Sequence, residues 1–326
     1  MLTNGCSNIM GAGSSIRRST SQKTNAELIS SLRANFEEHA QISNTHTNGN
    51  GVTSKPKGPS HEIWTKRSED GEELQIPRLD FSASALEEER EQYDITLKLF
   101  YLPGASATVR AAETKEALQL VLQELHMPSI DLLILSFPGI YFDEQEDCPD
   151  KISTRGPVES EPEAIETQIE AWKALEALHD EGLVKKLGIA EFGAERLGQF
   201  MGKTRVRPSV DQINLRDCCS VPKDLLAMAK SKRVELLVHN DCSNILPRGT
   251  VRELLGPGAG GANVLSEPSK AGDKRKSLHG EATNGASTEG LAGKVTPLWV
   301  IKYTAVVKNR GVVEKKGYFA CAELSG

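Results

Sequence analysis

The chain has 326 residues, of which 38% are hydrophobic and 26% are charged, and its formal net charge is -6. This composition supplies enough apolar side chains for a core, and an α/β barrel commonly takes about 200–250 residues as one domain. We therefore expect a single domain over residues 1–326, and the negative net charge excludes a general electrostatic field for nucleic acid or an anionic membrane.

The cysteines and the apolar stretches bear on the compartment. The six cysteines include no C-x-x-C pair and are too sparse for a disulfide framework, which favours a reducing environment. The longest apolar stretch, residues 132–142, is far shorter than the roughly 20 residues that cross a bilayer, and no charged-then-apolar signal peptide opens the chain. We expect a cytoplasmic protein that does not associate with a membrane.

Short apolar runs rich in β-branched residues alternate with helical patterns along the chain, which is typical of βα units around a parallel sheet. Strands are expected near Ile9 and over residues 79–83, 94–102, 131–138, 185–190, 210–214, 233–239 and 312–320. Helices are expected over residues 112–126, 161–181 and 222–231, with a last helix around Trp299. The number of strands favours an α/β fold of the (β/α)8 TIM-barrel type over an open doubly wound sheet.

Two stretches interrupt this pattern. Residues 41–61 are rich in Asn, Thr, Gly, Ser and Pro, and residues 256–294 contain no aromatic residue and are dominated by Gly, Ala, Ser, Glu and Lys. Ordering such segments would cost conformational entropy with little apolar area to bury, so we expect a flexible insert and a longer disordered insert. The GPGAGGA run at 256–262 resembles a phosphate-binding loop, but it follows a helical pattern and opens a low-complexity stretch, which favours a linker.

Two groups of residues are candidates for a redox or partner-contacting role. Cys218 and Cys219 are adjacent and follow the expected strand 210–214, where they are either small buried side chains or an exposed reactive pair. The C-terminal tail interleaves Trp299 and Tyr303 with basic residues such as Lys308 and Arg310. The apolar residues of this tail do not form one narrow helical stripe, so part of them could face a partner instead of closing the barrel.

Three motifs carry a family resemblance. The run Gly188-Ile189-Ala190-Glu191-Phe192 resembles the Gly-Val-Ser-Asn-Phe stretch of aldo-keto reductases, while residues 210–214 (VDQIN) and 130–138 (IDLLILSFP) resemble strands six and four of that family. Together they cover roughly residues 94–240. The resemblance implies an aldo-keto reductase type of TIM barrel.

Longer stretches resemble one branch of that superfamily. The segments 212–230, 235–241 and 297–323 are similar to the regulatory (modifier) subunits of glutamate–cysteine ligase, and the similarity extends to the start of the chain. This resemblance implies a non-catalytic protein that forms a heterodimer with the ligase's catalytic subunit and raises its activity in glutathione biosynthesis.

The residues that a reductase needs are mostly missing. The resemblance implies an Asp, a Tyr acid, a Lys and a His at the active site. Lys98 matches the Lys, but Ser136 occupies the His position, and no tyrosine lies between Asp80 and Tyr93. Strand eight ends near Ala320, close to the last residue given, which leaves no room for the usual nicotinamide phosphate site. We expect no cofactor.

Two further expectations follow from these residues. His239 and Cys242 lack further ligands at zinc spacing, so we expect no metal. The alternative to a regulatory protein is a divergent NADPH-dependent aldo-keto reductase with a rebuilt acid, in which Lys98 would keep its role. Cofactor binding separates the two hypotheses.

Overall fold

A computed structural model describes part of the chain. The described residues are 2–4, 25–46, 61–82, 85–142, 160–215, 221–242, 244–257, 261–266 and 290–326. The strands are β1 (Leu2–Asn4), β2 (Lys66–Arg67), β3 (Leu74–Gln75), β4 (Tyr93–Tyr101), β5 (Ile130–Ser136), β6 (Val184–Ala190), β7 (Val210–Asn214), β8 (Glu235–His239), β9 (Lys294–Val307) and β10 (Val312–Ser325). The helices are α1 (Ala26–His46), α2 (Arg110–Leu125), α3 (Ile165–Asp180), α4 (Ala194–Lys203), α5 (Lys223–Lys232) and α6 (Arg248–Leu255), with 3-10 turns at His61–Ile63 and Arg90–Gln92.

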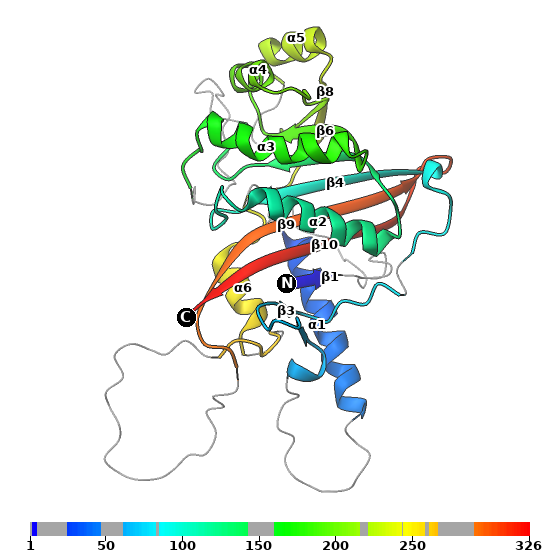
Figure 1. Ribbon diagram of the computed structural model, residues 1–326, viewed down its shortest axis with the longest axis vertical. Helices are drawn as coiled ribbons and strands as arrows, with labels where there is room; N and C mark the ends of the chain where they lie inside the picture. Colours follow the sequence, from blue (N-terminus) through cyan, green and yellow to red (C-terminus); the bar gives the residue numbers. More distant parts are fainter. Residues whose placement is uncertain are drawn as a thin grey trace, which may run out of the picture.

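One large sheet organises the fold (Figure 1). Its strand order is β1-β10-β9-β4-β5-β6-β7-β8, and β2 and β3 form a separate hairpin. Strands β4 to β8 are parallel neighbours joined through helices, so the α/β class is confirmed. The described residues depart from a regular eightfold βα repeat at the C-terminus, where β9 and β10 pair as an antiparallel hairpin and β9 also pairs antiparallel with β4.

The antiparallel strand β9 corrects one sequence-based expectation. The segment around Trp299 was expected to be helical, but it is a 14-residue strand. Trp299, Ile301, Tyr303 and Ala305 are all fully buried on one side of it, while Lys302 and Thr304 between them are partly exposed. This alternation has the period of two that a strand requires, and it explains why no helical stripe could be found.

The central strands and helices confirm the sequence reading. The expected strands 94–102, 131–138 and 210–214 correspond to β4, β5 and β7 within one or two residues at each end, and the expected helices correspond to α2, α3 and α5. Helix α3 buries Trp172, Leu175 and Leu178 and is followed by Gly182 with φ +76°, the left-handed conformation that favours glycine after a helix.

The expectations near the inserts have mixed outcomes. The strand expected over 79–83 is absent from its described residues, 79–82, which form an irregular strap. Helix α1 extends to His46, into the expected insert 41–61. In the second expected insert, Leu265 and Leu291 form a β-bridge. The rest of that insert, residues 258–260 and 267–289, lies outside the described residues. Residues 47–60 of the first insert and the strand expected near Ile9 also lie outside them. Flexibility of the inserts and the single-domain boundary stay predictions.

Two apolar layers hold the sheet. Helices α2, α3, α4 and α5 pack on one face around a large core, and α1 and α6 pack on the other face against β9 and β10. Figure 1 shows α2 and α3 lying across the front of the sheet and α1 and α6 below it. Among the described helices, none is long and apolar enough to cross a membrane.

Candidate functional site

The candidate site lies on the sheet face that points away from α2 and α3, near the carboxyl ends of the parallel strands. Alternation along β4 sends Leu97 and Leu99 toward the helices and Lys98 to the opposite face. Ser136 is the last residue of β5, and His239 is the last residue of β8. In βα barrels the carboxyl ends of the strands carry the chemistry, so this is the position where a reductase site is expected.

Lys98 is buried within a group of charged side chains. Its Nζ atom lies 3.2 Å from Asp241 Oδ2 and 3.2 Å from His239 Nδ1. The other carboxylate oxygen of Asp241 lies 3.2 Å from Lys302 Nζ on β9. Asp241 thus bridges two lysines, and Lys98 and Lys302 face each other in the β4–β9 register.

His239 connects this pair to a second carboxylate. Its Nε2 atom lies 2.5 Å from Glu191 Oε1, and its Nδ1 accepts a hydrogen bond of 3.1 Å from the backbone N–H of Asp241. A ring nitrogen that accepts must carry a lone pair, so the imidazole proton belongs on Nε2, facing Glu191. We call Lys98, Glu191, His239, Asp241 and Lys302 the buried charge cluster.

Backbone geometry holds Glu191 in this place. The residue follows β6 directly and has φ +67°, a left-handed conformation that costs a non-glycine residue about 1–3 kcal/mol. Its other carboxylate oxygen accepts a hydrogen bond of 2.9 Å from the Phe142 backbone N–H, and its own N–H donates to the Gln212 carbonyl at 3.0 Å. Glu191, at the end of β6, therefore contacts the segment after β5, strand β7 and the end of β8.

The charges of the cluster set the protonation of its members. Burial alone would raise the pKa of Asp241, but the positive charges of Lys98 and Lys302 outweigh it and lower that pKa to about 2. Burial lowers the pKa of Lys98, and the charges of Asp241 and Glu191 oppose this effect. The neighbouring Asp211 on β7 is fully buried, and burial raises its pKa well above the usual range.

The arrangement offers little to carbonyl reduction. Lys98 is present, but its hydrogen-bond partners among the described residues are His239 and Asp241, and no tyrosine hydroxyl contacts it. Tyr93 lies at the start of β4, where its hydroxyl donates to Glu314 at 2.8 Å. A tyrosine that passes its proton to a carbonyl must lie beside the lysine that lowers its pKa, so this geometry lacks the acid.

A nicotinamide cofactor, which the family implies, does not fit the buried charge cluster. Glu191 and Asp241 place two carboxylates there, and both are held by contacts to neighbouring side chains. A neutral carboxamide ring would have to break these pairs in a buried site, which leaves charges without partners and costs several kcal/mol, roughly 3–5 by analogy with broken buried pairs. No group of three or more metal-ligating side chains with suitable geometry occurs in the described part of the chain.

The candidate site residues that the sequence predicted lie in different parts of the fold. Lys98 and Ser136 lie on the same sheet face and both are buried. Trp299 and Tyr303 are fully buried in the core that α2 and α3 cover, which corrects the idea that they face a partner.

Lys308 and Arg310 lie in the β9–β10 turn, where they pair with Asp94 at 3.7 Å and with Glu88. Their exposure keeps a partner contact there as a prediction. Cys218 and Cys219 lie outside the described residues, so the redox or partner role suggested for them also stays a prediction.

Four members of the buried charge cluster were not predicted as site residues from the sequence. Glu191 was quoted within the family motif, where it stands in place of Asn, and His239 was considered only as a metal ligand. The signal that could have found them is a set of charged residues at the ends of neighbouring apolar strands, namely Glu191, His239 and Asp241. Lys302 was hidden because its segment was expected to be helical.

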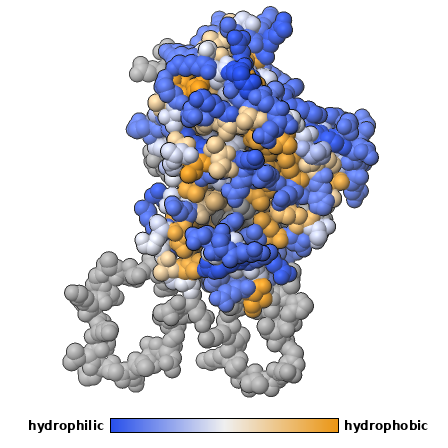
Figure 2. Space-filling model, in the orientation of Figure 1, coloured by the Kyte–Doolittle hydropathy of each residue, from blue (hydrophilic) through white to orange (hydrophobic). Residues whose placement is uncertain are grey.

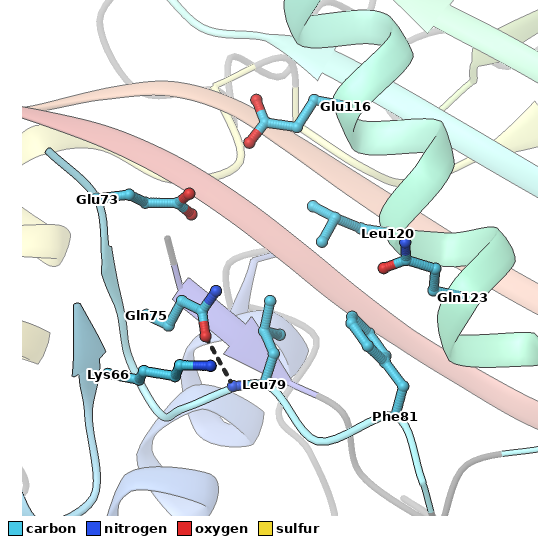
Figure 3. Close-up of a pocket in the computed structure, with 8 residues that line it drawn as sticks. All are labelled: Lys66, Glu73, Gln75, Leu79, Phe81, Glu116, Leu120 and Gln123. Carbon is cyan, nitrogen blue, oxygen red and sulfur yellow. Dashed lines mark hydrogen bonds between the residues drawn. The ribbon is translucent and has the colours of Figure 1, made fainter. Parts of the chain in front are cut away.

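A second feature is a pocket on the outer side of α2, which we call the α2 pocket (Figure 3). Its volume is about 350 Å³. Glu116 and Leu120 of α2 form one wall, Glu73 comes from the β2–β3 hairpin opposite, and Leu79 and Phe81 come from the irregular strap. Figure 3 shows the Glu73 and Glu116 carboxylates at one end of the pocket, directed toward each other from opposite walls.

Comparisons with known proteins identify the family of the chain. The profile of the Aldo/keto reductase family matches residues 79–244, about half of the chain, and the chain belongs to this family. Within it, the chain is similar to relatives named as regulatory subunits and, over a shorter stretch, to relatives named as reductases. It is 28% identical over 238 residues to a putative glutamate–cysteine ligase regulatory subunit of Schizosaccharomyces pombe, covering 72% of each chain.

A human relative and a solved structure are two further similar proteins. The glutamate–cysteine ligase regulatory subunit of Homo sapiens is 25% identical over 239 residues, which is 73% of this chain and 69% of that one. Among solved structures, the aldose reductase from Schistosoma japonicum is 23% identical with a TM-score of 0.34, over 51% of this chain and 52% of the reductase.

Proposed function

We propose that this chain is a non-catalytic regulatory subunit of glutamate–cysteine ligase, and that it binds the ligase's catalytic subunit as a heterodimer in the cytoplasm. The similarity to relatives named as regulatory subunits, which spans about 72% of the chain, carries the proposal. Membership of the aldo/keto reductase family is compatible with it, because a fold does not determine the chemistry of its site.

The buried charge cluster supports the absence of a reductase activity in this proposal. The one residue of the reductase set that matches, Lys98, is held by Asp241 and His239 instead of by a tyrosine. Ser136 cannot titrate near neutral pH as a histidine would. A cluster whose charges are paired with one another serves stability better than proton transfer.

A regulatory subunit acts through differential binding. It can raise the catalytic subunit's activity only by binding its active conformation more tightly than its inactive one, since equal affinity shifts no population. A tenfold shift in that equilibrium requires about 1.4 kcal/mol of differential affinity. This amount is available from a few contacts on an exposed surface, with no chemistry in the regulatory chain.

The test is the rate of γ-glutamylcysteine formation by the cognate catalytic chain, with and without this full-length protein, across glutamate and glutathione concentrations. We expect a saturable rise in rate at subsaturating glutamate, or a higher glutathione concentration for half-inhibition. An unchanged rate together with no co-elution of the two chains would contradict the proposal.

A control addresses the alternative function. Titration of the isolated chain with NADPH, followed by protein fluorescence, should give no saturable change below about 100 μM, well above the roughly micromolar affinities typical of such cofactor sites. Saturable micromolar binding with turnover of a test aldehyde would favour the reductase hypothesis instead.

A further inference from the structure

The α2 pocket contains negative charge that no described residue neutralises. Glu73 Oε1 is shielded from solvent and receives no hydrogen bond from the described residues. Neither Glu73 nor Glu116 forms an ion pair with a described side chain, although Lys66 lines the same pocket. In most proteins a carboxylate that is withdrawn from water is paired, so this pocket departs from the usual arrangement.

The two carboxylates also disfavour each other. Burial raises the pKa of Glu116, the negative charge of Glu73 raises it further, and the positive charge of the chain's N-terminal amino group opposes both effects. Two like charges on opposite walls store unfavourable energy that a cation between them would release. The charge therefore favours a positively charged occupant at that end of the pocket.

Away from the two glutamates, the pocket is lined by three apolar side chains, Leu79, Phe81 and Leu120, and by the polar side chains of Lys66, Gln75 and Gln123. Leu79, Phe81 and Leu120 line its middle, and the close-up shows them grouped beside the acidic end (Figure 3). A lysine or arginine side chain has this same division, with an apolar stem and a charged head. Its stem would cover the three apolar side chains while its head reached Glu73 and Glu116.

The surroundings favour a protein surface over a free small cation. The β2–β3 hairpin presents Glu69, Asp70 and Glu72 as exposed residues beside the pocket, next to Lys66 and Arg67. An acidic rim of this kind attracts and orients a basic surface during association, which an isolated cation would not need. Figure 2 shows apolar side chains gathered across the middle of this face, with hydrophilic surface around them.

We propose that the α2 pocket is a docking site for a lysine or arginine side chain of the partner protein, with Glu73 and Glu116 as its anion pair. The proposal rests on the proposed function, since the partner it invokes is the ligase's catalytic subunit. It assigns the pocket to recognition between subunits and places the interface on the side of α2 that faces the hairpin.

The experiment compares the affinity of the catalytic chain for the full-length protein and for the double variant Glu73→Gln, Glu116→Gln. Glutamine keeps the shape of each side chain and removes its charge, so we expect binding at least tenfold weaker at about 50 mM salt. The difference should shrink as salt is raised, because screening weakens exposed charge pairs. Charge reversal by Glu116→Lys should weaken binding further.

Controls separate the possible outcomes. Glu195→Gln on α4 removes a more exposed carboxylate far along the chain and should leave affinity unchanged within twofold. Thermal melting of the double variant should occur at or above the wild-type temperature, because a repulsive pair has been removed. Wild-type binding that the double variant retains in full would overturn the docking site while leaving the proposed function intact. Failure of the wild type to bind would overturn both.

Discussion

The buried charge cluster and the α2 pocket differ in whether their carboxylates contact oppositely charged side chains. In the cluster, two carboxylates face two lysines and a histidine, and the contacts of Asp241, Lys98 and Lys302 close on one another at 3.2 Å. In the α2 pocket, Glu73 and Glu116 face each other without an ion-paired partner among the described residues. The first arrangement brings opposite charges together within the chain, and the second brings two like charges together.

This difference indicates where to look for function in a family member whose Lys98 is held by Asp241 and His239. The inherited position at the strand ends has become an internal tie between β4, β8 and β9. The unsatisfied charge lies instead on the outer surface beside α2. Charges that are paired within the chain can hold the fold together, while recognition of another molecule requires groups that remain available.

The largest expected effect comes from breaking the cluster. Asp241→Ala leaves Lys98, which is 4% exposed, without its carboxylate, and we expect a loss of about 3–5 kcal/mol in the free energy of unfolding. Replacing the pair together, with Asp241→Leu and Lys98→Met, should recover part of that loss, because the buried charge of Lys98 is removed and Lys302, the other lysine that Asp241 contacts, is 31% exposed and can reach water. Urea denaturation at neutral pH measures both.

The matched control is an exposed carboxylate that also contacts a lysine. Asp94 has a side chain that is 61% exposed and pairs with Lys308 at 3.7 Å. Asp94→Ala should change the free energy of unfolding by less than about 1 kcal/mol. If Asp241→Ala cost no more than this control, the cluster would not be the internal tie that its distances suggest.

The next effect is a dependence on acid pH. The pKa of Asp241 is lowered from 3.8 to about 2 in the folded chain. A depressed pKa contributes stability that is present above 3.8 and lost as pH falls toward 2, which amounts to about 2 kcal/mol. The gap in unfolding free energy between the wild type and Asp241→Asn should therefore narrow as pH falls from about 4 to about 2. A gap that stays constant over this range would contradict the assigned ion pairs.

The sequence reading succeeded where local pattern decides the structure. The apolar runs of β4, β5 and β7 and the stripe of α3 are visible in the residues themselves. It failed at β9, because WVIKYTAVV mixes Lys302 and Thr304 into an apolar run. Val300 is buried between Trp299 and Ile301, so the period of two that identifies a strand appears only from Ile301 onward.

The site was predicted only in part, for a different reason. Lys98 could be found from its motif, but its partners come from β8 and the loop after it, and Lys302, which shares Asp241 with it, comes from the antiparallel β9. Their meeting depends on strand register and on the positive φ of Glu191, neither of which is a local property of the sequence. The α2 pocket depends likewise on how the strap at 79–82 crosses α2.

The smallest expected effect concerns the α2 pocket and can be measured on the isolated chain. A carboxyl group whose pKa is raised on folding contributes stability that is fully present below its ordinary pKa of 4.5 and lost as pH rises through the folded value. Glu116→Gln removes this loss. The free energy of unfolding of the variant should therefore equal that of the wild type near pH 4 and be higher at pH 7, by less than about 1 kcal/mol. Glu195→Gln should show no such divergence. A cation in the pocket would cancel the repulsion, so the higher stability of Glu116→Gln should disappear in the complex with the catalytic chain. A stability difference that persisted in the complex would mean that the pocket stays empty.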